Sequence, residues 1–183
     1  MTEAKEISDL MQAQYRRDRG LVARLLDQGH ELNVHEAAAV GDVDRLRELL
    51  DADPSLVHAW SPDGAQPLHF AAFFGHLDGC RLLVERGADV HVHARGFNGV
   101  APINSAAAND DKPNDVCTEI VRLLLEHGAE VDAAQANGAT ALHTAAFTHN
   151  RELARLLIDA GADADARTDD GRTPRTMDPS LFE

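Results

Sequence analysis

The sequence predicts an all-helical solenoid in which helix pairs stack to form a single domain. Three apolar segments align with one another: CRLLVERGADVHV (80–92), IVRLLLEHGAEVDA (120–133) and LARLLIDAGADADA (153–166). A turn-like segment alternates with them along the chain, as DGAQPLHFAA, NGVAPINSAA, NGATALHTAA and DGRTP. Self-similarity at a spacing of about 20–50 residues is typical of repeat architectures. The low aromatic content, 4%, indicates a core of Leu, Val and Ala.

The spacing and the turn motif identify the kind of repeat. A distance of 33 residues separates Gly138 from Gly171, whereas 35 separate Gly64 from Gly99 and 39 separate Gly99 from Gly138. The motif reads QPLHFA, APINSA and TALHTA, and RTP begins a fourth copy. It resembles the ankyrin repeat family, whose motif is T-P-L-H-x-A at a period of about 33 residues. The resemblance covers roughly residues 20 to 178. It implies a β-turn, an inner helix, an antiparallel outer helix and a loop in each repeat.

Local residue preferences agree with this pattern. Pro67 and Pro102 stand where an inner helix begins, and proline is favoured in the first helical turn because its missing N–H costs nothing there. Gly87, Gly128 and Gly161 follow the apolar ends of the outer helices. Glycine at that point adopts the left-handed conformation that closes many helices.

The repeats divide the chain into six segments. These are residues 1–32 (N-terminal capping helices), 33–60 (repeat 1), 61–95 (repeat 2), 96–134 (repeat 3), 135–167 (repeat 4) and 168–183 (a truncated C-terminal cap). Repeat 1 lacks its leading turn, has His35 at the motif histidine, and resembles the first repeats of bacterial ankyrin proteins. Residues 8–17 and 20–33 are expected to be the inner and outer helices of the cap. Terminal units of repeat proteins are commonly atypical because they present a soluble outer face.

Repeat 3 is irregular. It carries DDKPNDV, residues 110–116, in place of a single glycine, and Asn104 stands where other repeats have His69 and His143. We expect the insertion to be a tolerated surface loop, and the alternative is a functional lip beside the binding face.

Charge and composition exclude several classes of partner. Seventeen basic and thirty-one acidic residues give a net charge of −14, which opposes contact with phosphate backbones, so no nucleic acid is expected. No apolar run approaches the ~18 residues of a membrane span, and the first residues lack the plan of a secretion signal. Cys80 and Cys117 are expected to be packed free thiols. These features predict a cytoplasmic, monomeric protein without a membrane partner.

The histidines and other reactive residues favour a scaffold over an active site. The resemblance implies a structural role for His69, His143 and His35, which would bond the turns of adjacent repeats. His91 and His93 lie on one side of an extended HVH segment, but no second cluster completes a metal site. The chain has neither a GxSxG motif nor a glycine-rich phosphate loop. We therefore expect no enzyme activity, no metal and no cofactor.

The segment HFAAFFGH, residues 69–76, predicts a helix with two apolar faces. Leu68, Ala71 and Ala72 fall on one side, while Phe70, Phe73 and Phe74 gather on the other. An amphipathic helix normally has one apolar stripe, so the second face is either buried or used for binding. Phe70 stands at a leucine position of the family, and is expected to be core.

The family register places most aromatic residues on the concave groove, and this predicts a module that binds another protein. Aromatic side chains are typical interface anchors. The expected anchors are Trp60, Phe73, Phe74, Phe97 and Phe147, and the expected polar rim is Asp63, His93, Asn109 and Thr148. The alternative is that these residues bury one another, or that a terminal segment covers them.

Two other functions stay open at this point. A small-molecule site or enzyme in the same groove could use Asp63, His93, Asn104, Asp110 or His149 for acid–base work. An open groove would favour the protein partner, and a closed pocket under the inserted loop would favour the small molecule. A purely structural, self-associating module is the third possibility.

Overall fold

The computed structural model describes residues 7–108 and 114–182, and over these ranges it is all-helical, without a β-strand. In chain order the helices are α1 (Asp9–Tyr15), α2 (Arg19–Asp27), α3 (Val34–Val40), α4 (Val43–Ala52), η1 (Pro54–His58), α5 (Pro67–Phe73), α6 (Leu77–Glu85), η2 (Phe97–Gly99), α7 (Pro102–Ala107), α8 (Asn114–Glu126), α9 (Ala141–Phe147), α10 (Arg151–Asp159), α11 (Pro174–Met177) and η3 (Pro179–Phe182), where η marks a 3₁₀-helix. The all-α solenoid predicted from the sequence is confirmed.

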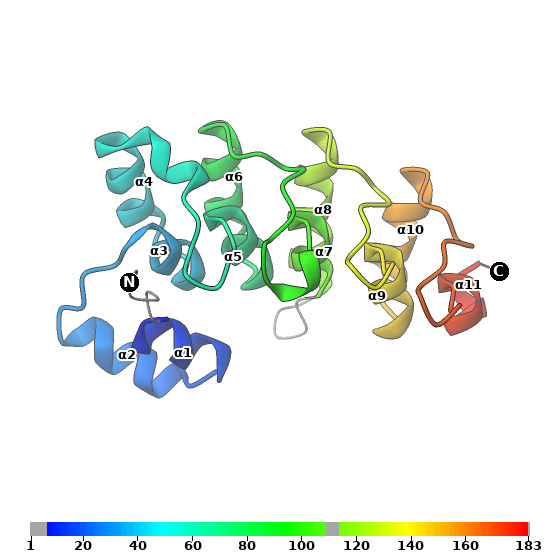
Figure 1. The fold of residues 1–183 in the computed structure, drawn as a ribbon, viewed down its shortest axis with the longest axis horizontal. Coiled ribbons are helices and arrows are strands. Elements are labelled where there is room, and N and C mark those ends of the chain that lie inside the picture. The colour runs from blue at the N-terminus through cyan, green and yellow to red at the C-terminus, as the bar shows by residue number, and fades with distance from the viewer. Residues whose placement is uncertain (1–6, 109–113, 183) are drawn as a thin grey trace, which may run out of the picture.

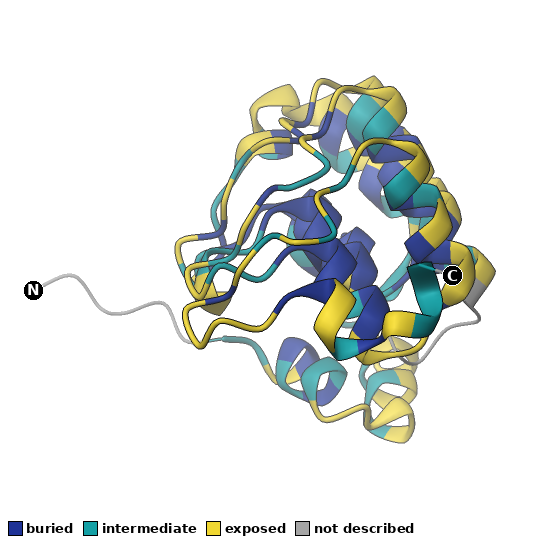
Figure 2. Ribbon diagram, turned by 90° about the vertical axis from the view of Figure 1, so that its right-hand side faces the viewer, coloured by how far each residue is buried: buried dark blue, intermediate teal, exposed yellow. Residues whose placement is uncertain are grey.

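From α3 onward the helices form two parallel rows (Figure 1). The inner row is α3, α5, α7 and α9, and the outer row is α4, α6, α8 and α10. Each inner helix packs against the next inner helix and against the outer helix of its own repeat. Figure 2 shows the buried residues concentrated in the inner row, with exposed residues on the outer surface of the outer row. We call the side of the inner row that faces away from the outer row the palm face.

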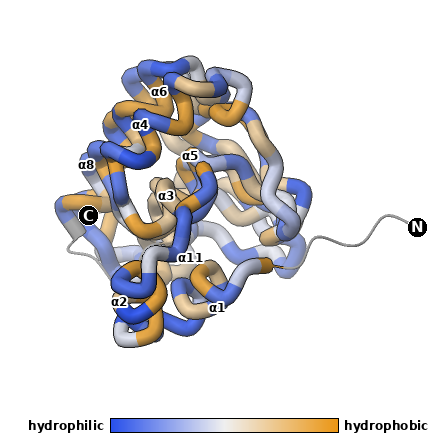
Figure 3. Tube along the Cα trace, turned by 90° about the vertical axis from the view of Figure 1, so that its left-hand side faces the viewer, coloured by the Kyte–Doolittle hydropathy of each residue, from blue (hydrophilic) through white to orange (hydrophobic). Residues whose placement is uncertain are grey.

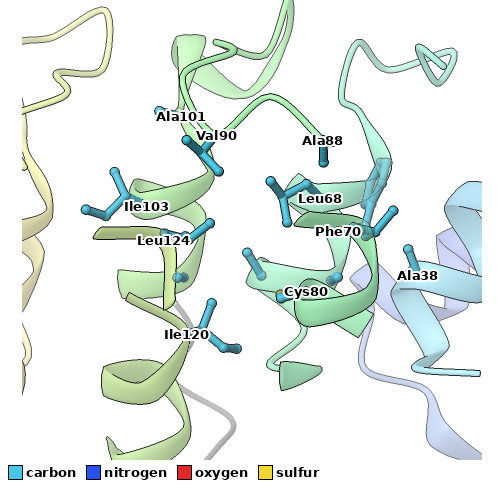
Figure 4. Close-up of a cluster of buried hydrophobic side chains, with 14 of the residues drawn as sticks. Ala38, Leu68, Phe70, Cys80, Ala88, Val90, Ala101, Ile103, Ile120 and Leu124 are labelled. Atoms are coloured by element: carbon cyan, nitrogen blue, oxygen red, sulfur yellow. The ribbon is translucent and has the colours of Figure 1, made fainter. Parts of the chain in front are cut away.

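Equivalent apolar residues of successive repeats build the core. Leu68, Ile103 and Leu142 occupy the second position of α5, α7 and α9, and each is at most 1% exposed. Figure 4 shows Leu68 and Cys80 of repeat 2 and Ile103 and Ile120 of repeat 3 within one cluster of buried side chains. Burying one such side chain contributes about 1.5–3 kcal/mol. The repeated apolar position therefore makes the core continuous from one repeat to the next.

The turns of adjacent repeats are joined through their backbones. The N–H of Arg95 donates to the carbonyl of Gly64 at 2.7 Å, and the N–H of Asp169 donates to the carbonyl of Asn137 at 3.0 Å. Gly64 has a φ of 86°, and a Cβ at this position would lie 2.8 Å from the amide nitrogen of Gly96. Only glycine combines this left-handed conformation with so close an approach of two backbones.

The two N-terminal helices fold back onto the palm face. Figures 1 and 3 show α1 and α2 beneath α3, on the side away from α4. The ring of Tyr15, at the end of α1, contacts Phe74 of repeat 2 and Phe97 of repeat 3. In a regular solenoid each unit contacts only its neighbours. Both helices proposed for the cap are present, and α1 reaches across the palm face to repeats 2 and 3.

Repeat 3 and the C-terminus depart from the regular pattern in different ways. Helix α8 has thirteen residues, whereas α6 and α10 have nine each. It begins at Asn114, so residues 114–116 of the predicted loop form its first turn, and residues 109–113 lie outside the described part. After α11, the short helix η3 stands in place of a full outer helix. Leu181 and Phe182 of η3 pack against the core.

Candidate binding face

The palm face presents one side chain from the equivalent position of each inner helix. These residues are Val40, Phe73, Ala108 and Phe147, at or directly after the ends of α3, α5, α7 and α9. Phe73 is 37% exposed, Phe147 is 73% exposed, and Ala108 is also exposed. The row therefore places a small side chain between two exposed aromatic rings.

An apolar pocket of about 290 Å³ opens beside Ala108. Its walls come from α1, α5, α7 and the turn before α7. The lining residues are Tyr15, Ala65, His69, Phe70, Phe73, Phe97, Val100, Ser105 and Ala108. Phe97, at the tip of the turn, is 45% exposed. The pocket is thus bounded by aromatic rings and open to the palm face.

Tyr15 is the wall of the pocket that does not come from a repeat. Its ring centroid lies 6.2 Å from that of Phe74 and 6.0 Å from that of Phe97. Its hydroxyl donates a hydrogen bond to a carboxylate oxygen of Asp63. Burial raises the pKa of Tyr15 well above its usual value, and the hydrogen bond and negative charge of Asp63 raise it further. Tyr15 is therefore a neutral phenol, and its hydrogen bond to Asp63 attaches α1 to the turn of repeat 2.

Further contacts fix α1 in this position. The hydroxyl of Ser8, which caps α1, donates to the buried carboxylate of Glu36 at 2.5 Å. The side-chain amide of Gln14 donates to the carbonyl of Ala39 at 3.1 Å. Leu10 is completely buried. By contrast, none of the nine described residues of α2 is buried. The docking of the pair thus depends mainly on α1.

The aromatic residues predicted as partner anchors occupy different environments. Phe73 and Phe97 line the pocket. Phe74 is half-buried beneath Tyr15, so a terminal segment does cover part of the predicted face. The guanidinium of Arg95 lies 4.0 Å from the ring centroid of Trp60, which is also half-buried. Trp60 and Phe74 are therefore not free anchors in this structure.

Phe70 behaves as predicted for a core residue. It is 3% exposed, and the ring of His35 meets it edge-on at 5.8 Å between centroids. The second apolar face of residues 69–76 therefore divides: Phe70 is buried in the core, Phe74 is half-covered by α1, and Phe73 remains exposed.

The predicted polar rim is only partly available. Asp63 accepts hydrogen bonds from Tyr15 and from the hydroxyl of Ser61. His93 is exposed, and its Nδ1 lies 2.7 Å from the carbonyl oxygen of Gly99.

The far end of the palm face is open. Thr148 is exposed beside Phe147, and its hydroxyl donates to the carbonyl of Thr144 at 2.9 Å. Asn109 lies outside the described residues.

The motif histidines are structural, as predicted. In His69, Nδ1 accepts the N–H of Gln66 at 3.2 Å, and Nε2 lies 3.1 Å from the carbonyl oxygen of Val92. His143 makes the equivalent bond from Nε2 to the carbonyl of Arg172 at 3.3 Å. Burial lowers the pKa of both imidazoles, which favours the neutral form.

His35 and Asn104 extend this series in repeats 1 and 3. His35 Nε2 lies 2.9 Å from the carbonyl oxygen of Ala59. In Asn104, Oδ1 accepts the N–H of Ala101 and Nδ2 donates to the carbonyl of Ala133, both at 2.9 Å. Asn104 is 0% exposed, so it takes the place of the motif histidine as a buried bridge.

The residues considered for acid–base work do not form one site in the described part of the chain. Asn104 is buried in the scaffold, and Asp63 is bonded to Tyr15. His149, after α9, pairs through Nδ1 with Asp178 at 2.7 Å. Asp110 lies outside the described residues. The positions of Asn104, Asp63 and His149 therefore do not support the alternative of an acid–base site in the groove.

Residues 7–108 and 114–182 also show neither a metal-binding cluster nor a membrane-spanning helix. These ranges contain no group of three or more His, Cys, Asp or Glu side chains placed to hold a metal ion. Cys80 and Cys117 are buried and form no disulfide, and burial raises the pKa of Cys80. Within the same ranges, every helix is too short or too polar to cross a membrane.

Sequence reasoning named Phe73 and Phe97 as site residues and missed the other walls of the pocket, among them Tyr15 and Ala108. Ala108 could have been found from its register, because it is equivalent to Phe73 and Phe147 in the other repeats. Tyr15 precedes the repeats, and so has no register from which its neighbours could be inferred.

Comparison with known proteins agrees with this architecture. The family model described as "Ankyrin repeats (3 copies)" matches residues 10–94 and 92–168. The chain is 30% identical to a transient receptor potential cation channel subfamily A member 1 homolog of Caenorhabditis elegans, covering 64% of this chain and 11% of the relative. It is 35% identical to the mouse ankyrin repeat and SAM domain-containing protein 6, over 60% of this chain and 12% of the relative. It is 30% identical to the chicken nuclear factor NF-kappa-B p105 subunit, over 79% of this chain and 14% of the relative.

The chain corresponds to only a small part of each of these relatives. The aligned part spans 11% to 14% of the length of the three relatives named. The repeat motif, the paired helix rows, the buried motif histidines and the family model all agree. The chain belongs to the ankyrin repeat family.

Proposed function

We propose that this chain is a non-catalytic module that binds another protein through its palm face. Ankyrin repeats are generally protein–protein interaction modules. The observation that carries the proposal is the exposure of Phe73, Phe97 and Phe147, together with the pocket that the first two line. Exposed apolar patches usually mark interaction sites, and aromatic side chains are common anchors in interfaces.

The arrangement favours a partner segment with two apolar side chains. One would enter the pocket between Phe73 and Phe97, and the other would lie against Phe147 in repeat 4. The net charge of −14 favours basic residues around these anchors, because complementary charge speeds association and excludes acidic competitors. The fold itself does not identify this partner.

A catalytic function has less support. The motif histidines and Asn104 already bond the turns of the scaffold, and Asp63 is engaged by Tyr15. The alternative of an acid–base site in the groove therefore lacks a set of converging titratable groups among the described residues.

The proposal is tested by affinity capture from the native source with three baits. These are the unmodified chain, the double variant Phe73→Ala/Phe147→Ala and the control Leu26→Ala. Leu26 is a matched control because it is 38% exposed but lies on α2, beside Asp42 and Arg45. Proteins captured by the unmodified chain and quantified by mass spectrometry should be retained by Leu26→Ala and lost from the double variant.

Folding of each bait is checked by circular dichroism and thermal melting before capture. If the folded double variant captures the same proteins as the unmodified chain, at the same abundance, the palm face is not the interface. Loss with both the double variant and Leu26→Ala would also contradict it, because Leu26 lies outside the proposed contact.

A further inference from the structure

The pocket beside Ala108 has the chemistry of a ligand site in its own right. We propose that it binds a small, uncharged apolar molecule about the size of one or two fused aromatic rings. This goes beyond the protein-binding function, since such a molecule would enter the pocket of the free chain, with no protein on the palm face.

The polar groups of the pocket are already engaged within the protein. Among the described lining residues, the hydroxyl of Tyr15 donates a hydrogen bond to Asp63. The hydroxyl of Ser105 donates one to the carbonyl of Ala101 at 3.3 Å. Both nitrogens of His69 are bonded to the backbone. A charged or strongly polar ligand would lose its hydration here without gaining replacement hydrogen bonds. The pocket therefore selects uncharged, apolar groups.

The size of the pocket sets the size of the ligand. An engineered cavity of about 150 Å³ lined by Leu, Ile and Phe stays dry and binds benzene. The pocket here has a volume of about 290 Å³, at the lower edge of the range for small-molecule sites, which begins near 300 Å³. It therefore has room for a benzene-sized ring and a second fused ring.

The walls favour a flat ring over a flexible chain. Tyr15, Phe70, Phe73 and Phe97 present aromatic rings to the pocket. Aromatic rings attract one another in offset-stacked and edge-to-face arrangements, and these geometries add to the gain from burial. Tyr15 is fixed by Asp63, so at least one wall is preorganised before a ligand enters.

The pocket exists because repeat 3 has alanine in the palm row. Ala108 is equivalent to Phe73 and Phe147, and its small side chain leaves the space that the pocket occupies. Because Ala108 is exposed, a larger side chain here can fill the pocket without disturbing the core. The variant Ala108→Leu therefore tests the site without removing a core contact.

The experiment titrates the full chain with two probes of the same shape, neutral naphthalene and anionic 2-naphthoate. Nuclear magnetic resonance follows the Ala65 and Ala108 methyl groups and the Phe73 ring, and calorimetry gives the stoichiometry. Naphthalene should bind saturably at one molecule per chain. Binding of 2-naphthoate should be weaker by about tenfold or more, because its carboxylate would be desolvated without a partner.

Two variants locate the binding. Ala108→Leu should weaken naphthalene binding by about tenfold or more, because it fills the space the ring would occupy. Phe147→Ala should leave binding unchanged, because Phe147 lies on the palm face but does not line the pocket. Removal of the pocket wall by Phe73→Ala gives a second, independent loss of affinity.

Three results would overturn the proposal: no saturable binding of naphthalene, equal binding of 2-naphthoate, or unchanged binding to folded Ala108→Leu. None of them bears on the capture experiment, in which no small molecule takes part. Failure of the ligand site and failure of the protein-binding function are therefore distinguishable.

Discussion

Tyr15 donates a hydrogen bond to Asp63, a residue 48 positions further along the chain. This bond joins a helix that precedes the repeats to the turn of repeat 2. It also explains why the palm face is less open than the aromatic residues suggested, because the Tyr15 ring that it holds covers Phe74.

We expect this bond to make the folded protein sensitive to alkaline pH. The pKa of Tyr15 is raised in the folded state, so the unfolded chain releases the proton first, near the ordinary tyrosine pKa of 10.0. Stability is therefore fully present below about pH 10 and is lost progressively as the pH rises above it. Tyr15 is the only tyrosine, so its phenolate absorbance reports this site alone.

The control for this prediction is Tyr15→Phe. At neutral pH it should lose about 1 kcal/mol of unfolding free energy, the usual contribution of one hydrogen bond. Its stability in urea should then decline less between pH 9 and pH 11 (about one unit on either side of the ordinary tyrosine pKa) than that of the unmodified chain. An equal decline in both proteins would show that Tyr15 does not carry the effect.

Phe70, Phe73 and Phe74 should differ in their contributions to stability. Phe70→Ala should cost roughly 3–5 kcal/mol, because it leaves a cavity in the core. Phe73→Ala should cost about 1 kcal/mol or less, as expected for a side chain that is 37% exposed. Phe74→Ala should fall between them, because Tyr15 covers its ring. Urea denaturation of the three variants measures this order, and equal losses would mean that the helix is simply buried.

The motif histidines should destabilise the protein in mild acid. Burial lowers the pKa of His69 and His143, so the unfolded chain takes up protons first as the pH falls below the ordinary histidine pKa of 6.5. Their contribution is therefore present above about pH 6.5 and is lost as the pH falls through the lower folded-state pKa.

Asn104 provides the control for this acid effect. It makes the same bridge from a side chain that does not titrate. We expect His143→Asn to remain folded at neutral pH and to lose less stability than the unmodified chain between about pH 6.5 and pH 5. A variant with the same acid sensitivity would contradict the assignment to His143.

Nucleic acid should not bind at physiological salt, because a net charge of −14 opposes contact with phosphates. The local exception to be tested is the basic group Arg16, Arg17 and Arg19. A gel shift with mixed DNA and RNA oligomers should show no saturable complex. If a complex forms, reversing the charge of these three arginines would show whether they are its cause.

The sequence was sufficient for most of the fold, because the information in a repeat is local. Each helix pair is specified by three local signals: a proline at the helix start, a glycine after the helix end and an apolar position that recurs in every repeat. The recurring apolar position also specifies how one pair packs against the next. Leu68, Ile103 and Leu142 can therefore be aligned by register alone. The same register correctly separated Phe70 from Phe73.

The candidate site was less predictable, because part of it depends on contacts outside the repeat pattern. Nothing in residues 8–17 indicates which face of the solenoid α1 packs against, so the cover over Phe74 and the bond to Asp63 could not be derived. Asn104 was considered as a reactive group, although it stands where other repeats have His69 and His143. The register therefore indicated its structural role, and its hydrogen bonds to Ala101 and Ala133 were visible only in three dimensions.

The position of Tyr15 also has a consequence for the order in which the chain assembles. During synthesis α1 emerges before Asp63, Phe74 and Phe97, so the contacts of Tyr15 must wait until about 80 further residues have been made and repeats 2 and 3 have formed. In a regular solenoid each repeat contacts only its neighbours. Once docked, α1 joins three repeats, because Ser8 bonds to Glu36 of repeat 1 while the ring of Tyr15 contacts repeats 2 and 3. Those repeats should then melt as one cooperative block, while repeat 4 and the C-terminal cap fray independently.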